Sequence, residues 1–147
     1  PMLADVSMRP TKAQIRAATA NFCQLLSIRR STPLLRLQTT HEIQRRMKFY
    51  NRGPAQVPGL IIASINDGDA STPGLEKLDS HYKRIVLVFN ATPHAISHGE
   101  LDLTVDFAGV DLELHPLIGD QVSKSSEFVD GVFKIPPYTW GVFVQRR

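Results

Sequence analysis

The chain has 147 residues, of which 42% are hydrophobic and 21% charged, a composition typical of one soluble globular domain. No apolar run approaches the roughly 18 residues that a membrane-spanning helix needs, so the sequence predicts no transmembrane segment. The single cysteine, Cys23, excludes an internal disulfide and a zinc site built from several thiolates. The chain begins at Pro1 without the basic region and apolar block of a secretion signal, and we interpret this start as a cut within a longer protein.

The net charge of +3 conceals two halves of opposite sign. Residues 1–58 carry ten Lys or Arg and two acidic residues, a net of +8, whereas residues 59–147 carry seven and twelve, a net of −5. A basic half can bind nucleic acid or an anionic surface. Packing of this half against the acidic half or a neighbouring domain is favoured instead, so we expect no nucleic-acid partner and no membrane partner.

The first predicted element is an amphipathic helix over residues 11–30. Thr11 and Gln14 have the spacing of a capping box, and Ser31-Thr32-Pro33 ends the helix because proline disfavours a helical residue before it. The apolar residues of one helical face are Ile15, Ala18, Phe22, Leu25 and Leu26. We expect this stripe to be the main association surface of the chain.

A second capping box, Thr39 with Glu42, predicts a short helix that ends at residues 51–54. From residue 59 onward the hydrophobic pattern changes from helical to strand-like. The expected strands are 60–65, 85–89, 100–107, 110–114, 128–129, 132–135 and 139–145. Asp130-Gly131 predicts a two-residue hairpin turn. The fold class is therefore mainly β, an antiparallel β-sandwich preceded by an amphipathic helix and a short second helix.

A search for catalytic carboxylates gives no marked pair. Asp102 and Asp106 lie on one face of an expected strand, about 13 Å apart at roughly 3.3 Å per residue. The two carboxyl groups of a glycosidase stand about 5 to 9.5 Å apart. The sequence also lacks a nucleophile elbow, a phosphate loop and a dinucleotide fingerprint. We predict no catalytic and no cofactor-binding residue.

No metal site is predicted either. Residues 66–69 have calcium-friendly side chains but lack the ligand series of a calcium loop, so we interpret them as a turn. His94 and His98 have a zinc-clamp spacing only on a helix, and Pro93 indicates a connection. Cys23 is interpreted as a small packing residue rather than a reactive thiol. Trp140 is expected in the core rather than as a sugar platform.

Several segments together carry a family resemblance. They are 1–5, 10–15, 22–37, 42–46, 51–54, 58–61, 67–68, 85–91, 114–116 and 142–144, and those within the first forty residues are the most specific. Along nearly its whole length the chain resembles the end of the catalytic barrel and the C-terminal domain of pullulanase-type α-1,6-glucosidases, limit dextrinases included. It departs from that pattern at Leu35, where Phe is usual, and at Trp140-Gly141, where smaller apolar residues are usual.

The resemblance implies that residues 1–38 are the end of a (β/α)₈ catalytic barrel and its exit linker, and that residues 39–147 are a C-terminal antiparallel β-sandwich domain. It implies a non-catalytic structural or accessory domain of a starch-debranching enzyme that hydrolyses α-1,6-glucosidic branch points in pullulan, amylopectin and limit dextrins. The family's Asp nucleophile and Glu acid lie upstream, so no catalytic residue, cofactor or metal is transferred to this chain. The implied partners are the upstream barrel and, through the parent enzyme, α-glucan. The implied location is the plastid in a plant or alga, and secreted or cell-associated in a bacterium.

The alternative is a stand-alone β-sandwich that binds a glycan or an anionic partner. Its candidate contact residues are Arg29, Arg30, Arg36, Arg45, Arg46, Lys48 and Arg52.

Overall fold

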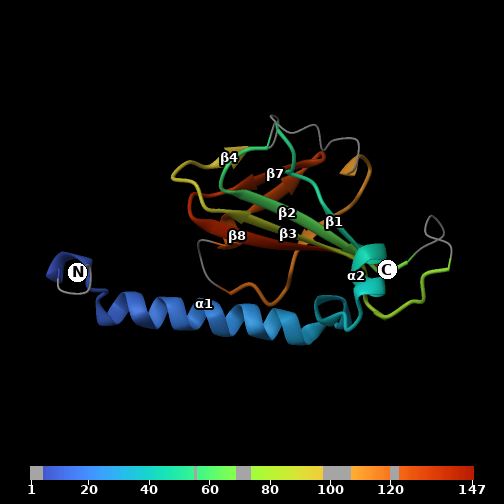
Figure 1. The fold of residues 1–147 in the computed structure, drawn as a ribbon, viewed down its shortest axis with the longest axis horizontal. Helices are drawn as coiled ribbons and strands as arrows, with labels where there is room; N and C mark the ends of the chain where they lie inside the picture. Colours follow the sequence, from blue (N-terminus) through green and yellow to red (C-terminus); the bar gives the residue numbers. More distant parts are fainter. Residues whose placement is uncertain (1–4, 55, 69–73, 98–106, 120–122) are drawn as a thin grey trace.

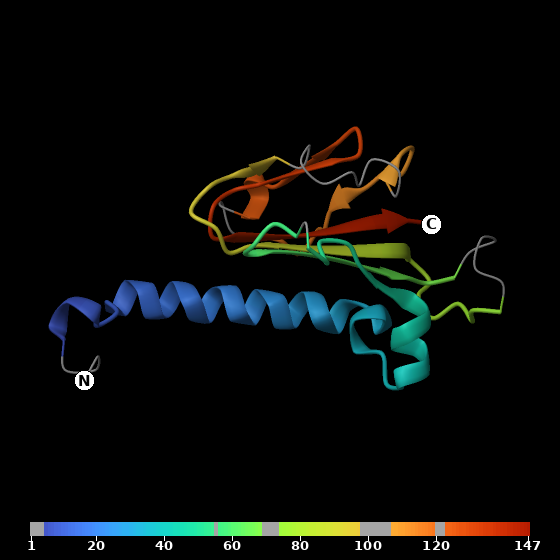
Figure 2. The same cartoon turned by 45° about the horizontal axis from the view of Figure 1, so that its top comes forward.

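The computed structural model describes residues 5–54, 56–68, 74–97, 107–119 and 123–147. Two antiparallel sheets pack face to face, and one long helix, α1, runs along the outer face of the larger sheet (Figures 1 and 2). The architecture is the predicted mainly-β sandwich preceded by helices. The sandwich lies at one end of α1, and the N-terminal end of the helix extends beyond it (Figure 2).

The long helix begins and ends where the sequence predicts. After the short 3₁₀ helix η2 (Val6–Met8), α1 (Lys12–Ser31) is capped by Thr11, whose hydroxyl accepts from the Gln14 amide at 3.2 Å. The Gln14 side chain in turn accepts from the Thr11 amide at 2.8 Å, which completes the capping box. Thr32 follows in an extended conformation and caps the 3₁₀ helix η3 (Pro33–Arg36).

The second helix is shorter than predicted. Thr39 caps α2 (Thr40–Arg46) as expected, and its hydroxyl accepts from the Glu42 amide at 3.2 Å. The sequence prediction that the helix continues to residues 51–54 is wrong, because Met47–Phe49 form strand β1. These residues pair with the next strand, Met47 opposite Ile65, and this tertiary pairing overrides the helical spacing of the apolar residues.

The larger sheet has the order β1-β2-β3-β8-β5, and the smaller has the order β4-β7-β6. The remaining strands of the larger sheet are β2 (Leu60–Asn66), β3 (Tyr82–Asn90), β5 (Glu113–Leu114) and β8 (Thr139–Arg146). Those of the smaller sheet are β4 (Ile96–Ser97), β6 (Glu127–Val129) and β7 (Val132–Ile135). A further 3₁₀ turn, η5 (Ser123–Ser125), precedes β6.

The predicted hairpin is confirmed by its backbone. Val129 pairs with Val132 across the turn, and Asp130 and Gly131 have φ values of 50° and 84°. Both central residues of a type I′ turn need positive φ, which is why Asp-Gly is favoured there. The predicted strand at 100–107 lies outside the described residues except for Phe107, and the predicted strand at 110–114 is reduced to β5.

Two apolar cores lie on the two faces of the larger sheet. The inner core fills the space between the sheets, and its members are Leu60, Ile62, Val86, Val88, Phe107, Leu112, Phe133, Ile135 and Phe143. The outer core joins the sheet to α1 and η3, and its members are Ile28, Leu34, Ile65, Tyr82, Ile85, Ile118, Val142 and Val144. Strand β3 contributes to both cores, so its predicted coverage on both faces is confirmed.

The unusual Gly141 has a packing reason. A Cβ atom on this residue would come within 2.8 Å of the Phe143 ring, which belongs to the inner core. Leu35, the other departure from the family pattern, is partly buried against the outer core.

Candidate functional site

A buried ionic cluster joins α2, the end of β2 and the C-terminal end of β8. Asp67 is fully buried, and its Oδ1 accepts from Arg46 Nη1 at 3.2 Å and from the Leu78 amide at 2.8 Å. Its Oδ2 accepts from the Asp79 amide at 2.9 Å and from the Arg147 guanidinium. Four donors satisfy one buried carboxylate, which therefore ties three separate parts of the chain together.

Arg46 is the second centre of this cluster. Its side chain has no exposed surface and donates to the Glu76 carbonyl at 2.6 Å and to the Glu42 carboxylate. The bond from Arg46 lowers the pKa of the Glu42 carboxyl from its usual value. A buried charge is tolerated only when it is paired and hydrogen-bonded, and this arrangement meets that condition.

A second buried carboxylate fixes the end of α1. Asp79 accepts a hydrogen bond from the hydroxyl of Thr32, which itself accepts from the Leu34 amide at 3.1 Å. The amides of His81 and Tyr82 donate to Asp79 at 2.8 and 3.1 Å. Burial, the largest single influence, raises the pKa of Asp79, but the bonds from Thr32, His81 and Tyr82 together outweigh it, so the pKa is lowered.

His115 makes a third link to α1. The Leu117 amide donates to its Nδ1 at 3.2 Å, so Nε2 carries the proton and faces Ser31 Oγ at 3.2 Å. Ser31 donates onward to the Ile28 carbonyl at 2.7 Å. Burial is the main cause that lowers the pKa of His115, and the positive charge of Arg146 adds to it. The imidazole is therefore held neutral.

The outer face of the larger sheet is covered at one end and uncovered at the other. At the covered end, Ile65, Ile85 and Val144 lie side by side on β2, β3 and β8, and each is at most 2% exposed. Four residues along, Ile61, Phe89 and Trp140 form the corresponding row. Ile61 is 53% exposed and the other two are half-buried. We call this row, together with the exposed Phe49 of β1, the open end.

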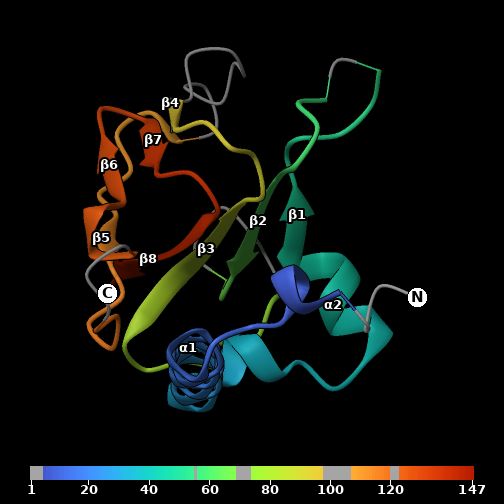
Figure 3. The same cartoon turned by 90° about the vertical axis from the view of Figure 1, so that its left-hand side faces the viewer.

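The apolar stripe of α1 is also largely uncovered. Of its members, Ile15, Phe22 and Leu26 are 52%, 61% and 41% exposed, and Leu25 is half-buried. The buried residue of α1 is Ile28, which lies outside the stripe near the C-terminal end. Viewed along its axis, α1 lies beside the outer sheet face below β3, and the short helix α2 lies next to β1 (Figure 3). Exposed apolar residues that lie together on one face are typical of an interaction site.

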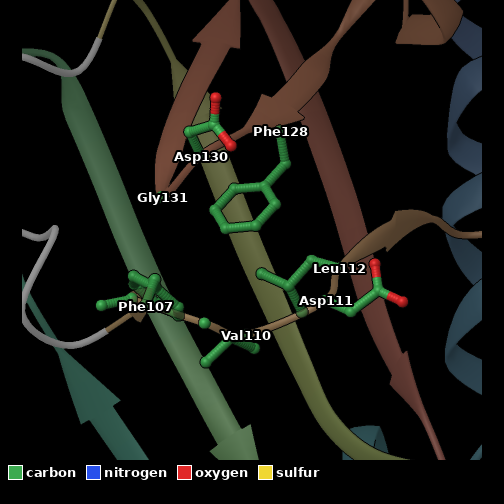
Figure 4. Close-up of a pocket in the computed structure, with 9 residues that line it drawn as sticks. Phe107, Val110, Asp111, Leu112, Phe128, Asp130 and Gly131 are labelled. Atoms are coloured by element: carbon green, nitrogen blue, oxygen red, sulfur yellow. The ribbon is translucent and has the colours of Figure 1, made fainter.

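A cavity of about 450 Å³ lies on the opposite side of the molecule, between residues 107–112 and the β6–β7 turn. The ring of Phe128 lies between Asp130 on one side and Leu112 with Asp111 on the other (Figure 4). The two aspartates are exposed. Neither has a hydrogen-bond or ion-pair partner among the residues that the structure describes.

The sequence-predicted candidates do not come together into a site. Asp102, Asp106 and His98 lie outside the described residues, and His94 is an exposed loop residue whose carbonyl accepts from Asn90 at 2.8 Å. The packing role predicted for Cys23 is wrong within this chain, because the residue is exposed on α1. Trp140 is half-buried against the outer core, which is closer to the predicted core position than to a free platform.

Sequence reasoning missed the buried ionic cluster. The sequence predicts only a turn at residues 66–69, yet the carboxylate of Asp67 accepts four hydrogen bonds. The alternative function includes Arg46 among the residues of a basic binding surface, but the buried side chain cannot contribute to one. One feature of the sequence does point to this cluster, namely the Asp67-Gly68 pair directly after an apolar strand. Gly68 has a φ of 71°, a conformation that favours glycine and lets the chain turn next to Asp67.

The described residues offer neither a metal cluster nor a membrane-spanning helix. No group of three or more His, Cys, Asp or Glu there could hold a metal ion. Within the same part of the chain, no helix is long and apolar enough to cross a membrane.

Comparison with known proteins shows which family the chain resembles. A family model described as α-1,6-glucosidases, pullulanase-type, C-terminal, matches residues 1–146. The chain is 40% identical over 152 residues to pullulanase 1, chloroplastic, of Arabidopsis thaliana, a match that covers 100% of the chain and 15% of that protein. It is 28% identical over 123 residues to a pullulanase of Klebsiella pneumoniae, covering 84% of the chain and 10% of the relative.

Solved structures agree with these relatives. Apo pullulanase from Klebsiella pneumoniae matches with a TM-score of 0.80 and 29% identity, over 94% of this chain and 14% of that one. The pullulanase of the same organism complexed with maltotriose gives a TM-score of 0.79 and 27% identity, over 94% and 13% of the two chains. The chain thus spans only a small part of the length of the proteins it matches.

Proposed function

Because this chain belongs to the family of C-terminal domains of pullulanase-type α-1,6-glucosidases, we propose that it is the non-catalytic, structural part of a starch-debranching enzyme. In this proposal the whole protein hydrolyses α-1,6-glucosidic branch points in pullulan, amylopectin and limit dextrins. Its catalytic carboxylates lie in the much longer portion that precedes this domain in the relatives. Residues 1–38 complete a (β/α)₈ barrel, and residues 39–147 form the accessory sandwich.

The single observation that carries the proposal is the uncovered apolar surface formed by the stripe of α1 and the open end of the sheet. Phe22, Leu26 and Ile61 are 61%, 41% and 53% exposed. Burying each such side chain fully is worth about 1.5 to 3 kcal/mol relative to leaving it in water. The occupant of this surface in our proposal is the upstream barrel, to which α1 is covalently continuous.

The hydrogen bonds at the end of α1 give this docking its rigidity. Thr32 and Ser31 at the end of α1 are bonded to Asp79 and His115 of the sandwich. Gln24 Nε2, earlier in the helix, donates to the Leu117 carbonyl at 3.3 Å. The last two turns of the helix are therefore fixed to the sandwich, while its earlier turns remain available to the barrel. A helix shared in this way sets the position of the sandwich on the barrel.

The alternative of an anionic binding module has less support. The buried Arg46 belongs to the ionic cluster, and Arg45 and Lys48 already have interaction partners. The basic residues that remain are spread over α1, η3 and the segment after β1 rather than gathered around a cavity.

The test compares the full-length protein with the 147-residue chain. We expect the full-length protein to release reducing sugar from pullulan and the short chain to release none, because a retaining glycosidase needs a positioned carboxylate pair. Activity of the short chain that disappears on mutation of its own carboxylates would overturn the proposal.

The docking surface is tested by matched substitutions. Ile61→Ser in the full-length protein should lower the stability of the barrel and sandwich together, by about 2 kcal/mol in free energy of unfolding. Val129→Ser removes a side chain of similar exposure, 47%, from the opposite sheet and should change little. Equal effects of the two substitutions would place the docking surface elsewhere.

A further inference from the structure

We infer that the cavity beside Phe128 is a subsite for a short oligosaccharide, an α-glucan chain in the setting of the proposed function, on which this choice of sugar rests. The volume of about 450 Å³ falls within the range of roughly 300–1,000 Å³ found for small-molecule sites. The cavity is distinct from the apolar docking surface and lies on the other side of the larger sheet.

The floor of the cavity is a rigid aromatic ring. Phe128 packs at 4.7 Å from the ring of Phe133 and at 6.2 Å from that of Phe107, measured between ring centroids. These contacts hold the ring in place, and the Phe128 side chain is only half-buried. A ring fixed in this way offers an apolar surface to the C–H face of a pyranose without first losing conformational freedom.

The rim supplies the polar groups that a sugar requires. Asp130 occupies the first position of the β6–β7 turn with a φ of 50°, so the turn geometry fixes its backbone beside the Phe128 ring (Figure 4). A carboxylate accepts hydrogen bonds from several hydroxyl groups, and bonds to a charged acceptor are roughly twice as strong as neutral ones. Asp111 lies at the far rim next to Leu112 (Figure 4). The two carboxylates therefore supply hydrogen-bond acceptors on opposite sides of the ring.

Other ligand classes fit less well. The described residues that line the cavity include two carboxylates and no Lys, Arg or His, which disfavours an anionic ligand. A metal ion is disfavoured because no group of three potential ligand side chains occurs within the described residues. A purely apolar ligand would leave both carboxylates without partners. A neutral molecule with one apolar face and many hydroxyl groups satisfies the ring and the carboxylates together.

The position of the cavity allows it to bind a sugar while α1 is docked on the barrel. The β6–β7 hairpin belongs to the smaller sheet, which lies across the larger sheet from α1 (Figure 2). A barrel bound to the α1 side leaves this cavity open. The subsite can then hold a glucan chain while another part of the same polymer occupies the catalytic centre.

The experiment is a titration of the 147-residue chain with maltotriose, followed through the backbone amide resonances. We expect saturable shifts centred on Gly109 and Gly131, which line the cavity. Asp130→Asn should weaken binding about tenfold, because it replaces a charged acceptor with a neutral one. Asn tolerates positive φ, so the turn is preserved. Asp111→Asn, at the far rim, should weaken binding about two- to threefold.

The matched control is Glu127→Gln. Glu127 lies on β6, next to Phe128, but lines a different cavity, so this substitution should leave the affinity for maltotriose unchanged. Three outcomes would each overturn the subsite. They are the absence of saturable shifts, shifts centred on the Trp140 indole, and equal affinity of Asp130→Asn and the unaltered chain for maltotriose. These outcomes leave the proposed function standing, since pullulan hydrolysis by the full-length protein and the Ile61→Ser effect do not depend on this cavity. Conversely, saturable maltotriose binding at Gly131 by a chain whose full-length form lacks pullulanase activity would support a binding subsite and overturn only the parent function.

Discussion

The two ends of the outer sheet face differ in what covers them. At the covered end, Ile65, Ile85 and Val144 lie beneath Ile28 and Leu34, and the neighbouring polar groups of Asp67, Asp79 and His115 all have partners. At the open end, Ile61 and Phe49 are about half exposed, at 53% and 50%.

This difference separates the residues that stabilise the domain, at the covered end, from the residues available to bind a partner, at the open end. The covered end combines apolar burial with buried carboxylates, so a single lost contact there leaves a charge unpaired in a dry environment. The four residues of the open end are all apolar, so no buried charge depends on them. A substitution at the open end removes apolar surface that water already reaches. We therefore expect stability to depend on the covered end and association on the uncovered surface.

The largest effect is expected for Asp67→Asn. The substitution keeps the volume of the side chain but removes the negative charge that faces the buried Arg46 and Arg147. Breaking a buried charge pair typically costs about 3–5 kcal/mol, and we expect a loss in free energy of unfolding at the lower end of that range. Denaturant-induced unfolding at pH 7 measures it.

The matched control is Asp111→Asn, the same change at an exposed carboxylate, which should alter stability by less than about 0.5 kcal/mol. Similar losses in the two variants would mean that the ionic cluster is not the main support of the covered end.

Thr32→Val should have a smaller effect of about 2 kcal/mol. The change keeps the shape of the side chain but leaves Asp79 without its hydroxyl donor and the Leu34 amide without its cap. Thr19→Val is the control, because Thr19 is an exposed residue of the same helix whose hydroxyl bonds only to the Ile15 carbonyl at 2.9 Å. If both variants melt at the same temperature, the end of α1 is not fixed through Asp79.

These two sites mark the limit of what the sequence predicts. The capping boxes at Thr11 and Thr39, the Asp130-Gly131 turn and the long strands follow from local spacing, because each depends on residues a few positions apart. The bond between Thr32 and Asp79 joins residues 47 positions apart, and that between Asp67 and Arg147 joins residues 80 apart. Neither pairing has a local pattern.

The same limit explains the errors at β1 and Cys23. The spacing of Ile43 and Met47 is helical, but the pairing of Met47 with Ile65 depends on a strand that begins well beyond it in the chain. Cys23 follows Phe22 of the apolar stripe of α1, but whether a helical face is covered depends on the fold, and Cys23 is exposed. The cavity beside Phe128 likewise forms between two segments that only the fold brings together.

Acidification should weaken the covered end through His115. Its pKa is lowered in the folded chain relative to the ordinary value of 6.5, so below that value the unfolded chain binds a proton that the folded chain does not. Stability is then present above about pH 6.5 and is lost as the pH falls towards the lower folded pKa. Thermal melts across this window should show the decline.

His115→Gln is the diagnostic variant, because its amide can still donate towards Ser31 but does not titrate. The pH dependence above pH 5 should be much reduced in this variant. The contribution of Asp79 appears only in stronger acid, since its pKa lies below the ordinary 3.8. A decline of equal slope in both proteins would assign the pH dependence to other groups.

The smallest effect on stability is expected at the uncovered stripe. Phe22→Ser with Leu26→Ser removes two side chains that are already 61% and 41% exposed, so little burial is lost on folding. The helix propensities of Phe, Leu and Ser differ by a few tenths of a kcal/mol. We expect the free energy of unfolding to change by less than about 1 kcal/mol. Concentration-dependent association, measured by sedimentation, should nevertheless fall.

This pairing of a small stability change with reduced association is what distinguishes a surface from a core. Val129→Ser removes a comparable exposed side chain, 47%, from the smaller sheet and should change neither property, because that strand lies away from α1. If the double variant instead unfolds the whole chain with a loss of several kcal/mol, the stripe is part of the sandwich core. The boundary near residue 38 is then misplaced, since a helix whose middle turns support the sandwich belongs to the sandwich rather than to the barrel that precedes it.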